Sequence, residues 1–197
     1  MLASKGIALP VFAQQLRDAG ITLLQYRDKT GPQKQILHNA AVIAGIIKGV
    51  NATLVMNDSP ELAQLAGWRA VHVGQTDAAV AEARLALPLG IVGCSTHSAQ
   101  QVVEADAAGA DYIAIGPDFS TSTKQNPDPV VGLEGVRLAR SLTSRPLVAI
   151  GGITAENAAS VIEAGADSVA VIGALCQPGA TAAQWVEIFM RAMPNPD

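Results

Sequence analysis

The sequence contains few of the residues that mark several classes of protein. Its 197 residues include only 2 Cys, 3 His, 2 Trp and 2 Tyr. Cys94 and Cys176 lie in no Cys or His cluster, so a zinc site and a disulfide framework have little support and a reducing cytoplasm is the expected location. No apolar run approaches the roughly 20 residues that cross a bilayer, and Pro10 interrupts the short apolar stretch near the N-terminus. We expect neither a membrane span nor a signal peptide.

An excess of basic charge is also absent. The chain has 13 Lys+Arg against 17 Asp+Glu, a formal net charge of -4. This balance gives no general attraction to nucleic acid or acidic membranes, so any anion must be bound by a local group of residues. Hydrophobic residues make up 49% of the chain, enough for a sizeable core. We expect one domain over residues 1–197, with homo-oligomers possible.

One pattern recurs along the chain: an amphipathic helix, a glycine and then a short β-branched run. Glycine ends a helix readily because it accepts a left-handed backbone, so each copy predicts a helix followed at once by a strand. Ser59, Ser98 and Thr154 precede helical patterns as expected caps. The pattern predicts seven strands, at residues 21–26, 53–57, 70–73, 91–95, 111–116, 146–151 and 168–172.

This alternation predicts an α/β fold with a parallel sheet covered by helices. Polar residues follow nearly every predicted strand instead of gathering at one point of the sheet, which favours a (β/α)8 TIM barrel over a doubly wound sheet. An eighth strand is not evident, since residues 11–19 have a helical pattern and residues 1–9 are a poor strand. We therefore expect a barrel lacking its first strand, in a truncated chain or one with a misassigned start.

The first predicted strand ends in a cationic segment, Gln25 to Lys29. Strand alternation would place Gln25, Arg27 and Lys29 on one side. Two cations and an amide suit a polyanion such as a diphosphate, because Arg offers a fork of donors and Lys a point charge. A solvated strand end with ordinary ion pairs explains the same residues equally well.

Two acidic residues follow the next strands. Asp58 comes after the second strand and Asp77 after the third, so the two carboxylates would approach each other at one end of the sheet. Beside a diphosphate site, such a pair would hold Mg²⁺ with few protein oxygens. The alternative for Asp58 is a cap of the helix that starts near Pro60.

The segment after the fourth strand contains Ser95, His97 and Ser98. A serine near a histidine suggests a hydrolase, but no G-x-S-x-G elbow is present. We interpret Ser95 as a hydrogen-bond donor, and His97 and Ser98 as the start of a helix. His72 alternates with two valines and is expected to be a half-buried barrel residue, not a metal ligand.

A long loop and two glycine turns offer phosphate-binding groups. The loop at residues 116–129 has the length of a lid, and Thr121, Thr123 and Lys124 could clamp a phosphate. The turns at Gly152 and Gly173 follow the last two strands, where barrels commonly bind phosphate through backbone N–H groups. A solvated loop and ordinary tight turns are the alternatives.

As a set, several segments resemble the thiamine-phosphate synthase family, in the family's order along the chain: residues 25–29, 57–58, 72–77, 93–97, 111–117, 121–124, 149–153 and 172–173. The family's opening strand has no counterpart here. The resemblance implies an enzyme that joins a hydroxymethylpyrimidine diphosphate to a thiazole phosphate, giving thiamine phosphate and pyrophosphate, with Mg²⁺ as cofactor.

The resemblance also implies a role for each matching residue. Asp58 and Asp77 would hold Mg²⁺, and Arg27, Lys29, Ser95 and Lys124 would be catalytic. The residues implied to bind the pyrimidine diphosphate are Gln25, Tyr26, Arg27, Asp28, Lys29, Asn57, Ser95 and Lys124. Those implied to bind the thiazole phosphate are Thr121, Ser122, Thr123, Gly152, Ile172 and Gly173.

Two alternatives remain open at this point. A thiazole tautomerase shares the fold and could use His97 as an acid or base, but it needs neither a diphosphate nor a metal. The second alternative is a non-catalytic protein that binds a phosphorylated ligand, which applies if the missing strand abolishes catalysis.

Overall fold

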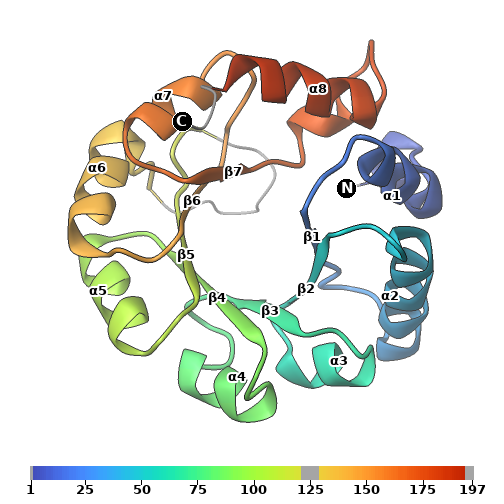
Figure 1. Ribbon diagram of the computed structural model, residues 1–197, viewed down its shortest axis with the longest axis horizontal. Coiled ribbons are helices and arrows are strands. Elements are labelled where there is room, and N and C mark those ends of the chain that lie inside the picture. The colour runs from blue at the N-terminus through green and yellow to red at the C-terminus, as the bar shows by residue number, and fades with distance from the viewer. Residues whose placement is uncertain (1, 121–128, 194–197) are drawn as a thin grey trace. The chain divides into compact units, whose positions relative to one another are not determined.

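The computed structural model describes residues 2–120 and 129–193. The chain divides into two compact units, residues 1–93 and 94–197. Helices and strands alternate along the chain in both units, as the sequence predicted (Figure 1). Strand β4 (Ile91–Thr96) begins in the first unit and ends in the second.

The first unit is a parallel β/α arrangement. Its other strands are β1 (Leu23–Tyr26), β2 (Thr53–Asn57) and β3 (Ala70–Val73). Its helices are the 3-10 helix η1 (Ala3–Lys5), α1 (Leu9–Asp18), α2 (Gln33–Ile47), α3 (Pro60–Leu65) and α4 (Val80–Ala86). In the parallel register Tyr26 lies opposite Met56, and Asn57 lies opposite His72. Residues that follow these three strands therefore lie along one edge of the sheet.

Burial in this unit follows the strand and helix periodicities. All four residues of β3 are buried, whereas Leu23 at the start of β1 is 49% exposed. Helix α2 buries Ile36, Ala40, Ile43 and Ile47, spaced by three and four residues, so one stripe of the helix faces the core. Each fully buried isoleucine of this kind contributes about 1.5–3 kcal/mol through the hydrophobic effect.

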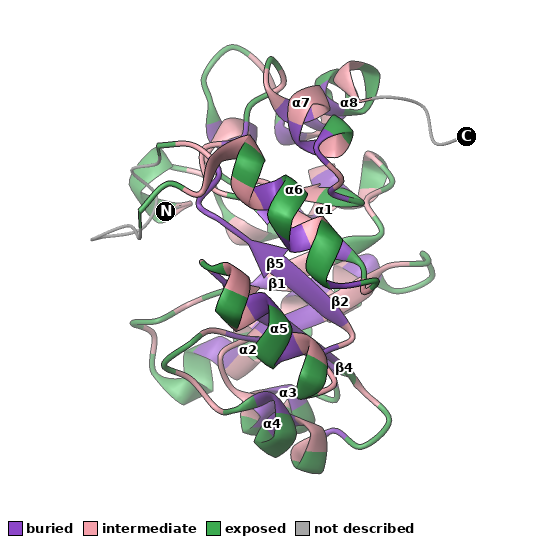
Figure 2. Ribbon diagram, turned by 90° about the vertical axis from the view of Figure 1, so that its left-hand side faces the viewer, coloured by how far each residue is buried: buried purple, intermediate pink, exposed green. Residues whose placement is uncertain are grey.

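The second unit continues the same pattern. Its strands after β4 are β5 (Tyr112–Ile115), β6 (Leu147–Ile150) and β7 (Ser168–Ala170). Its helices are α5 (Ala99–Ala107), α6 (Gly132–Leu142), α7 (Ala158–Glu163), the 3-10 helix η2 (Ala174–Cys176) and α8 (Ala182–Ala192). Ile115 pairs with Ala149, and Ile150 pairs with Ala170, in parallel. Strand β5 is buried along its length (Figure 2).

The structure confirms the seven predicted strands to within a few residues at each end. Ser59 and Ser98 cap their helices as predicted, accepting hydrogen bonds from the backbone N–H of Leu62 and Gln101. The predicted cap at Thr154 is wrong, because α7 starts only at Ala158. Asn157 is the N-cap of α7, and its side chain accepts a hydrogen bond from the Thr154 N–H.

The N-terminal residues also agree with expectation. Among residues 2–9, the described part of the first nine, a 3-10 turn and the start of α1 are present and no strand is formed. No helix within the described ranges is both long and apolar enough to cross a membrane.

Candidate active site

The predicted site residues are distributed over both units. The first unit carries Gln25, Tyr26, Arg27, Asp28, Lys29, Asn57, Asp58 and Asp77. The second carries Ser95, Gly152, Ile172 and Gly173. Thr121, Ser122, Thr123 and Lys124 lie outside the described residues.

Strand β1 ends at Tyr26, so strand alternation reaches only Gln25 and Tyr26 and does not orient the two cations that follow. Tyr26 is 8% exposed, and its hydroxyl accepts a hydrogen bond from Asn39 Nδ2 at 2.9 Å. The same hydroxyl lies 3.4 Å from Asp28 Oδ2 and donates to it. Tyr26 therefore links helix α2 to the segment that carries Arg27 and Lys29.

Asp28 shapes that segment. Its Oδ1 accepts hydrogen bonds from the backbone N–H of Thr30 at 3.1 Å and of Gly31 at 2.9 Å. These bonds, the one from Gly31 first, hold the pKa of Asp28 below its ordinary value. Asp28 thus holds the turn in place, while Arg27 and Lys29 on either side of it are exposed.

Lys29, Asp58 and Asp77 form a charged cluster at the ends of β1, β2 and β3. Lys29 Nζ lies 2.9 Å from Asp58 Oδ2. Asp58 has a left-handed backbone, φ 66°, and its N–H donates to the carbonyl of His72 at 2.8 Å, which fixes it beside β3. Asp77 Oδ2 accepts a hydrogen bond from the Gly74 N–H at 2.7 Å. The structure therefore confirms that the residues after these three strands converge.

The alternative role for Asp58 is excluded, because Ser59 caps helix α3. Burial raises the pKa of Asp58 above its ordinary value, and the neighbouring Asp77 carboxylate raises it further. Lys29 opposes both effects. Within the described residues, these two adjacent carboxylates are paired with one exposed lysine, which favours a further cation.

This arrangement fits Mg²⁺. The ion prefers carboxylate oxygens and usually takes only one or two of them, leaving its other positions to water and substrate phosphates. In residues 2–120 and 129–193, no group of three or more His, Cys, Asp or Glu side chains is placed to hold a metal. A two-carboxylate site completed by a substrate is thus the kind that these residues can form.

His72 is a residue of β3 and lies opposite Asn57 of β2 in the parallel register. It is 6% exposed, more deeply buried than the half-buried position expected from the sequence. Burial lowers its pKa to about 4, and the Asp77 carboxylate only partly opposes this. His72 is therefore neutral at pH 7.

In the second unit, Ser95 is half-buried on β4 and follows the buried Cys94. Burial raises the pKa of the Cys94 thiol, so it is not an activated nucleophile. Cys176, in η2, is buried too.

His97 lies where β4 leads into α5, as predicted. Its backbone N–H donates to Gln101 Oε1 at 2.7 Å, and its ring Nδ1 contacts the carbonyl of Gly116, beyond the end of β5. The Gly116 carbonyl is therefore a partner of the His97 ring within the fold.

Asp118 is a buried acid that the sequence interpretation did not single out. It is 1% exposed, and neither of its carboxylate oxygens has a hydrogen-bond partner within the described parts of the chain. Burial raises its pKa to about 7. It stands three positions after Ile115, the last residue of β5, and its sequence neighbours do not mark it as buried.

Gly116 and Gly152 allow the ends of β5 and β6 to approach closely. A Cβ on Gly116 would lie 2.0 Å from the Ile150 carbonyl oxygen, and one on Gly152 would lie 2.6 Å from that of Ser120. The Asp118 N–H donates to the Ile150 carbonyl at 3.0 Å. Gly152 also has a positive φ of 68°, so it serves a tight turn here.

Ile172 and Gly173 lead into η2. Their carbonyls accept hydrogen bonds from the N–H groups of Leu175 and Cys176 at 3.1 and 3.2 Å. Gly173 is the N-cap of this 3-10 helix.

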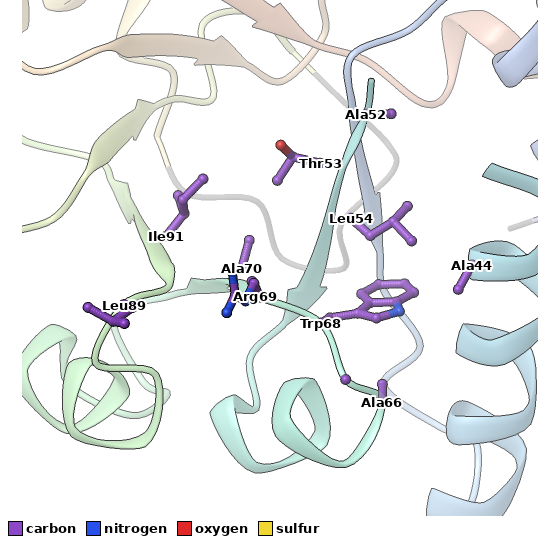
Figure 3. A pocket seen from close by; sticks show the side chains of 11 residues that line it. Ala44, Ala52, Thr53, Leu54, Ala66, Trp68, Arg69, Ala70, Leu89 and Ile91 are labelled. Carbon is purple, nitrogen blue, oxygen red and sulfur yellow. The ribbon is translucent and has the colours of Figure 1, made fainter. Parts of the chain in front are cut away.

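A cavity of about 490 Å³ lies at the opposite ends of the first unit's strands, where β2, β3 and β4 begin (Figure 3). Its lining is mostly apolar and includes Trp68, Leu54 and Ile91. The chemistry-bearing side chains described above are not among its lining residues.

Comparisons with known proteins agree with one another. A family model described as thiamine monophosphate synthase matches residues 4–175. Thiamine-phosphate synthase of Koribacter versatilis is 51% identical over 180 residues, covering 90% of this chain and 85% of that protein. The enzyme of the same name from Methanoculleus marisnigri is 44% identical over 161 residues, covering 81% and 76%.

Among solved structures, thiamine phosphate pyrophosphorylase from Pyrococcus furiosus has a TM-score of 0.86 at 27% identity, covering 96% of this chain and 91% of that one. 3-Hexulose-6-phosphate synthase has a TM-score of 0.69 at 18% identity, covering 94% of each chain, which shows likeness of fold alone. The predicted (β/α)8 barrel class is confirmed, with seven parallel strands among the described residues.

Proposed function

The chain belongs to the thiamine monophosphate synthase family, and from that premise we propose how its side chains divide the work of a thiamine-phosphate synthase. The enzyme is a transferase. It joins hydroxymethylpyrimidine diphosphate to thiazole phosphate, giving thiamine phosphate and pyrophosphate. The observation that carries this assignment is the convergence of Lys29, Asp58 and Asp77 at the ends of three adjacent strands.

The pyrimidine diphosphate is bound through its charge. Arg27 and Lys29 are exposed cations on a turn that Tyr26 and Asp28 hold in place. Gln25, Asn57, Ser95 and Lys124 complete this set in the proposal. Asp58 and Asp77 would hold Mg²⁺, which when bound neutralises diphosphate charge.

The thiazole phosphate is bound by the second unit. Gly152, Ile172 and Gly173 stand at two turns whose backbone N–H groups suit a phosphate. Thr121, Ser122 and Thr123 supply hydroxyls in the proposal.

The chemistry needs no nucleophilic side chain. The bond between the pyrimidine methylene carbon and the diphosphate oxygen breaks, and pyrophosphate leaves with the electron pair. The electron-rich aminopyrimidine stabilises the methylene cation, and the lone pair of the thiazole nitrogen then forms the new C–N bond. Negative charge grows on the leaving group, so Arg27, Lys29 and Lys124 act by stabilising it. Positioning of the two substrates supplies much of the remaining rate.

A pyrophosphate-release assay with both substrates tests the assignment, with Mg²⁺ titrated in. Activity should require both substrates and the metal. Arg27→Ala and Lys124→Ala should each lower kcat by about a hundredfold, the scale seen when a charge-stabilising donor is removed. Cys94→Ala is the control and should change kcat little. Wild-type kcat in Lys124→Ala would refute its role at the leaving group.

The same assay separates the alternatives. Binding of thiazole phosphate without pyrophosphate release would favour a binding protein. Conversion of the thiazole alone, without metal or diphosphate, would favour a tautomerase.

A further inference from the structure

The corner formed by the ends of β5 and β6 contains a carboxyl group that the reaction above does not use. Asp118 follows β5, and its N–H bonds the Ile150 carbonyl at the end of β6. The next residue, Phe119, donates its N–H to the Gly151 carbonyl at 3.0 Å. The Asp118 backbone thus lies against the turn that contains Gly151 and Gly152.

The backbone around Asp118 packs closely against that turn. A Cβ on Gly151 would lie 2.7 Å from Pro117 Cα and 3.6 Å from the Asp118 nitrogen. A Cβ on Gly152 would lie 2.7 Å from the Phe119 carbonyl oxygen. Two backbone hydrogen bonds, from the N–H groups of Asp118 and Phe119, therefore hold this segment against a turn where only glycine fits.

The carboxyl itself is buried without compensation. Asp118 is 1% exposed, and its two oxygens find no hydrogen-bond partner among residues 2–120 and 129–193. An ionised carboxylate in such surroundings is costly, so the neutral acid is favoured.

Among residues 2–120 and 129–193, few other titratable groups belong to the elements that contact this corner. His97, from the end of β4, touches it through the Gly116 carbonyl. The ends of β5 and β6 contribute none besides Asp118. Helix α6 contacts the corner through its N-cap, because the Val131 N–H donates to the Pro117 carbonyl. Its Glu134 and Arg137 pair with each other. Its third titratable side chain, Arg140, pairs with Asp167.

We propose that Asp118 is a positioning residue for the thiazole phosphate. When its buried carboxyl is neutral, the neighbouring Gly152 turn binds the phosphate. When the carboxyl is ionised, it repels that phosphate. The inference rests on the proposed function, which places the phosphate at Gly152. Like charges at short range in a poorly solvated site disfavour each other, so phosphate binding and ionisation of Asp118 must oppose one another.

The direction of the effect follows from the pKa of Asp118, which burial raises to about 7. Below that pH the carboxyl is neutral and the turn binds the phosphate. As the pH rises past 7 the carboxyl ionises and the affinity falls. A coupling of one pKa unit corresponds to about a tenfold change in affinity.

The test measures Kd and KM for thiazole phosphate at pH 6 and pH 8.5 in the wild type, in Asp118→Asn and in Glu163→Gln. Asn has nearly the same shape but cannot ionise, while Glu163→Gln removes an exposed carboxylate of the same unit. The ligand's phosphate also titrates, but equally in all three proteins. The wild type and Glu163→Gln should lose about tenfold more affinity than Asp118→Asn, and KM should change more than kcat.

The outcomes separate this inference from the proposed function. Turnover with the same pH dependence in the wild type and Asp118→Asn overturns the role of Asp118 and leaves the function standing. Absence of thiazole phosphate binding in the wild type at both pH values overturns the proposed function, and the inference with it.

A measurement on the unmutated protein covers the case in which Asp118→Asn does not fold. The carboxyl ¹³C shift of Asp118 is titrated with and without saturating inorganic phosphate. By reciprocity, bound phosphate should raise the pKa of Asp118. An unchanged pKa overturns the inference.

Discussion

Asp58 and Asp118 each follow a parallel strand, and burial raises the pKa of both. Their neighbours differ. Asp58 has Lys29 at 2.9 Å and shares its surroundings with Asp77, whereas Asp118 has no polar partner on its carboxyl within the described residues. The comparison shows that position at the end of a strand does not fix the role of an acid. The partner groups decide whether it serves as a charge or as a neutral group.

The largest expected effect comes from breaking the acid pair. Asp77→Asn removes one negative charge but keeps an oxygen that can accept the Gly74 N–H. At a fixed, subsaturating Mg²⁺ concentration, turnover should fall about 10²–10³-fold, because metal-assisted charge stabilisation is worth several kcal/mol.

Raising Mg²⁺ should recover part of the lost turnover, and Asp18→Asn, an exposed change on α1, serves as the control. Equal activity of Asp77→Asn and the wild type across the Mg²⁺ titration would show that the pair does not hold the metal.

The next effect concerns stability and sharpens the contrast at Asp118. Its folded-state pKa of about 7 lies above that of an unfolded aspartate, near 4. The contribution of the Asp118 carboxyl to the free energy of unfolding is therefore complete below about pH 4. That contribution is lost as the pH rises toward 7. Between pH 5 and pH 8 this loss amounts to roughly 2–3 kcal/mol.

Urea unfolding of the wild type and Asp118→Asn at both pH values measures that loss. The difference in free energy of unfolding between the two proteins should shift by the stated amount in favour of Asn at pH 8. A difference that stays constant with pH would show that the carboxyl is already ionised at pH 5 or compensated when it ionises.

The smallest expected effect tests the support of the charged cluster. Tyr26→Phe removes the hydroxyl that joins Asn39 to Asp28 and should lower the free energy of unfolding by about 1 kcal/mol. KM for the pyrimidine diphosphate should rise a few-fold, since Arg27 and Lys29 keep their charges but lose a fixed turn. A change in kcat with no change in KM would argue against this supporting role.

Much of the fold could be predicted because each element has a local cause. Glycine after a helix, serine before one and continuous apolar strands are signals of a few neighbouring residues, and the seven strands follow from them. The exceptions are also local. Thr154 has a suitable hydroxyl, but the chain makes a further turn before α7 begins.

The site divides in the same manner. Convergence of Lys29, Asp58 and Asp77 could be predicted, since parallel strands bring their carboxyl ends to one edge. The partners of Tyr26 could not, because Asn39 is brought to it by the packing of α2. Asp118 was missed for a related reason: burial of an acid depends on what surrounds it in space, and its sequence neighbours resemble those of any loop.

The two cysteines have a practical consequence. Both thiols are buried, and the raised pKa of Cys94 lowers its thiolate fraction further. The natural sequence is therefore a suitable background for maleimide labelling, without prior removal of its own thiols. A cysteine introduced at Leu85, which is 82% exposed on α4, or at Leu138, 51% exposed on α6, would be the fast-reacting thiol and would place a dye on one chosen unit.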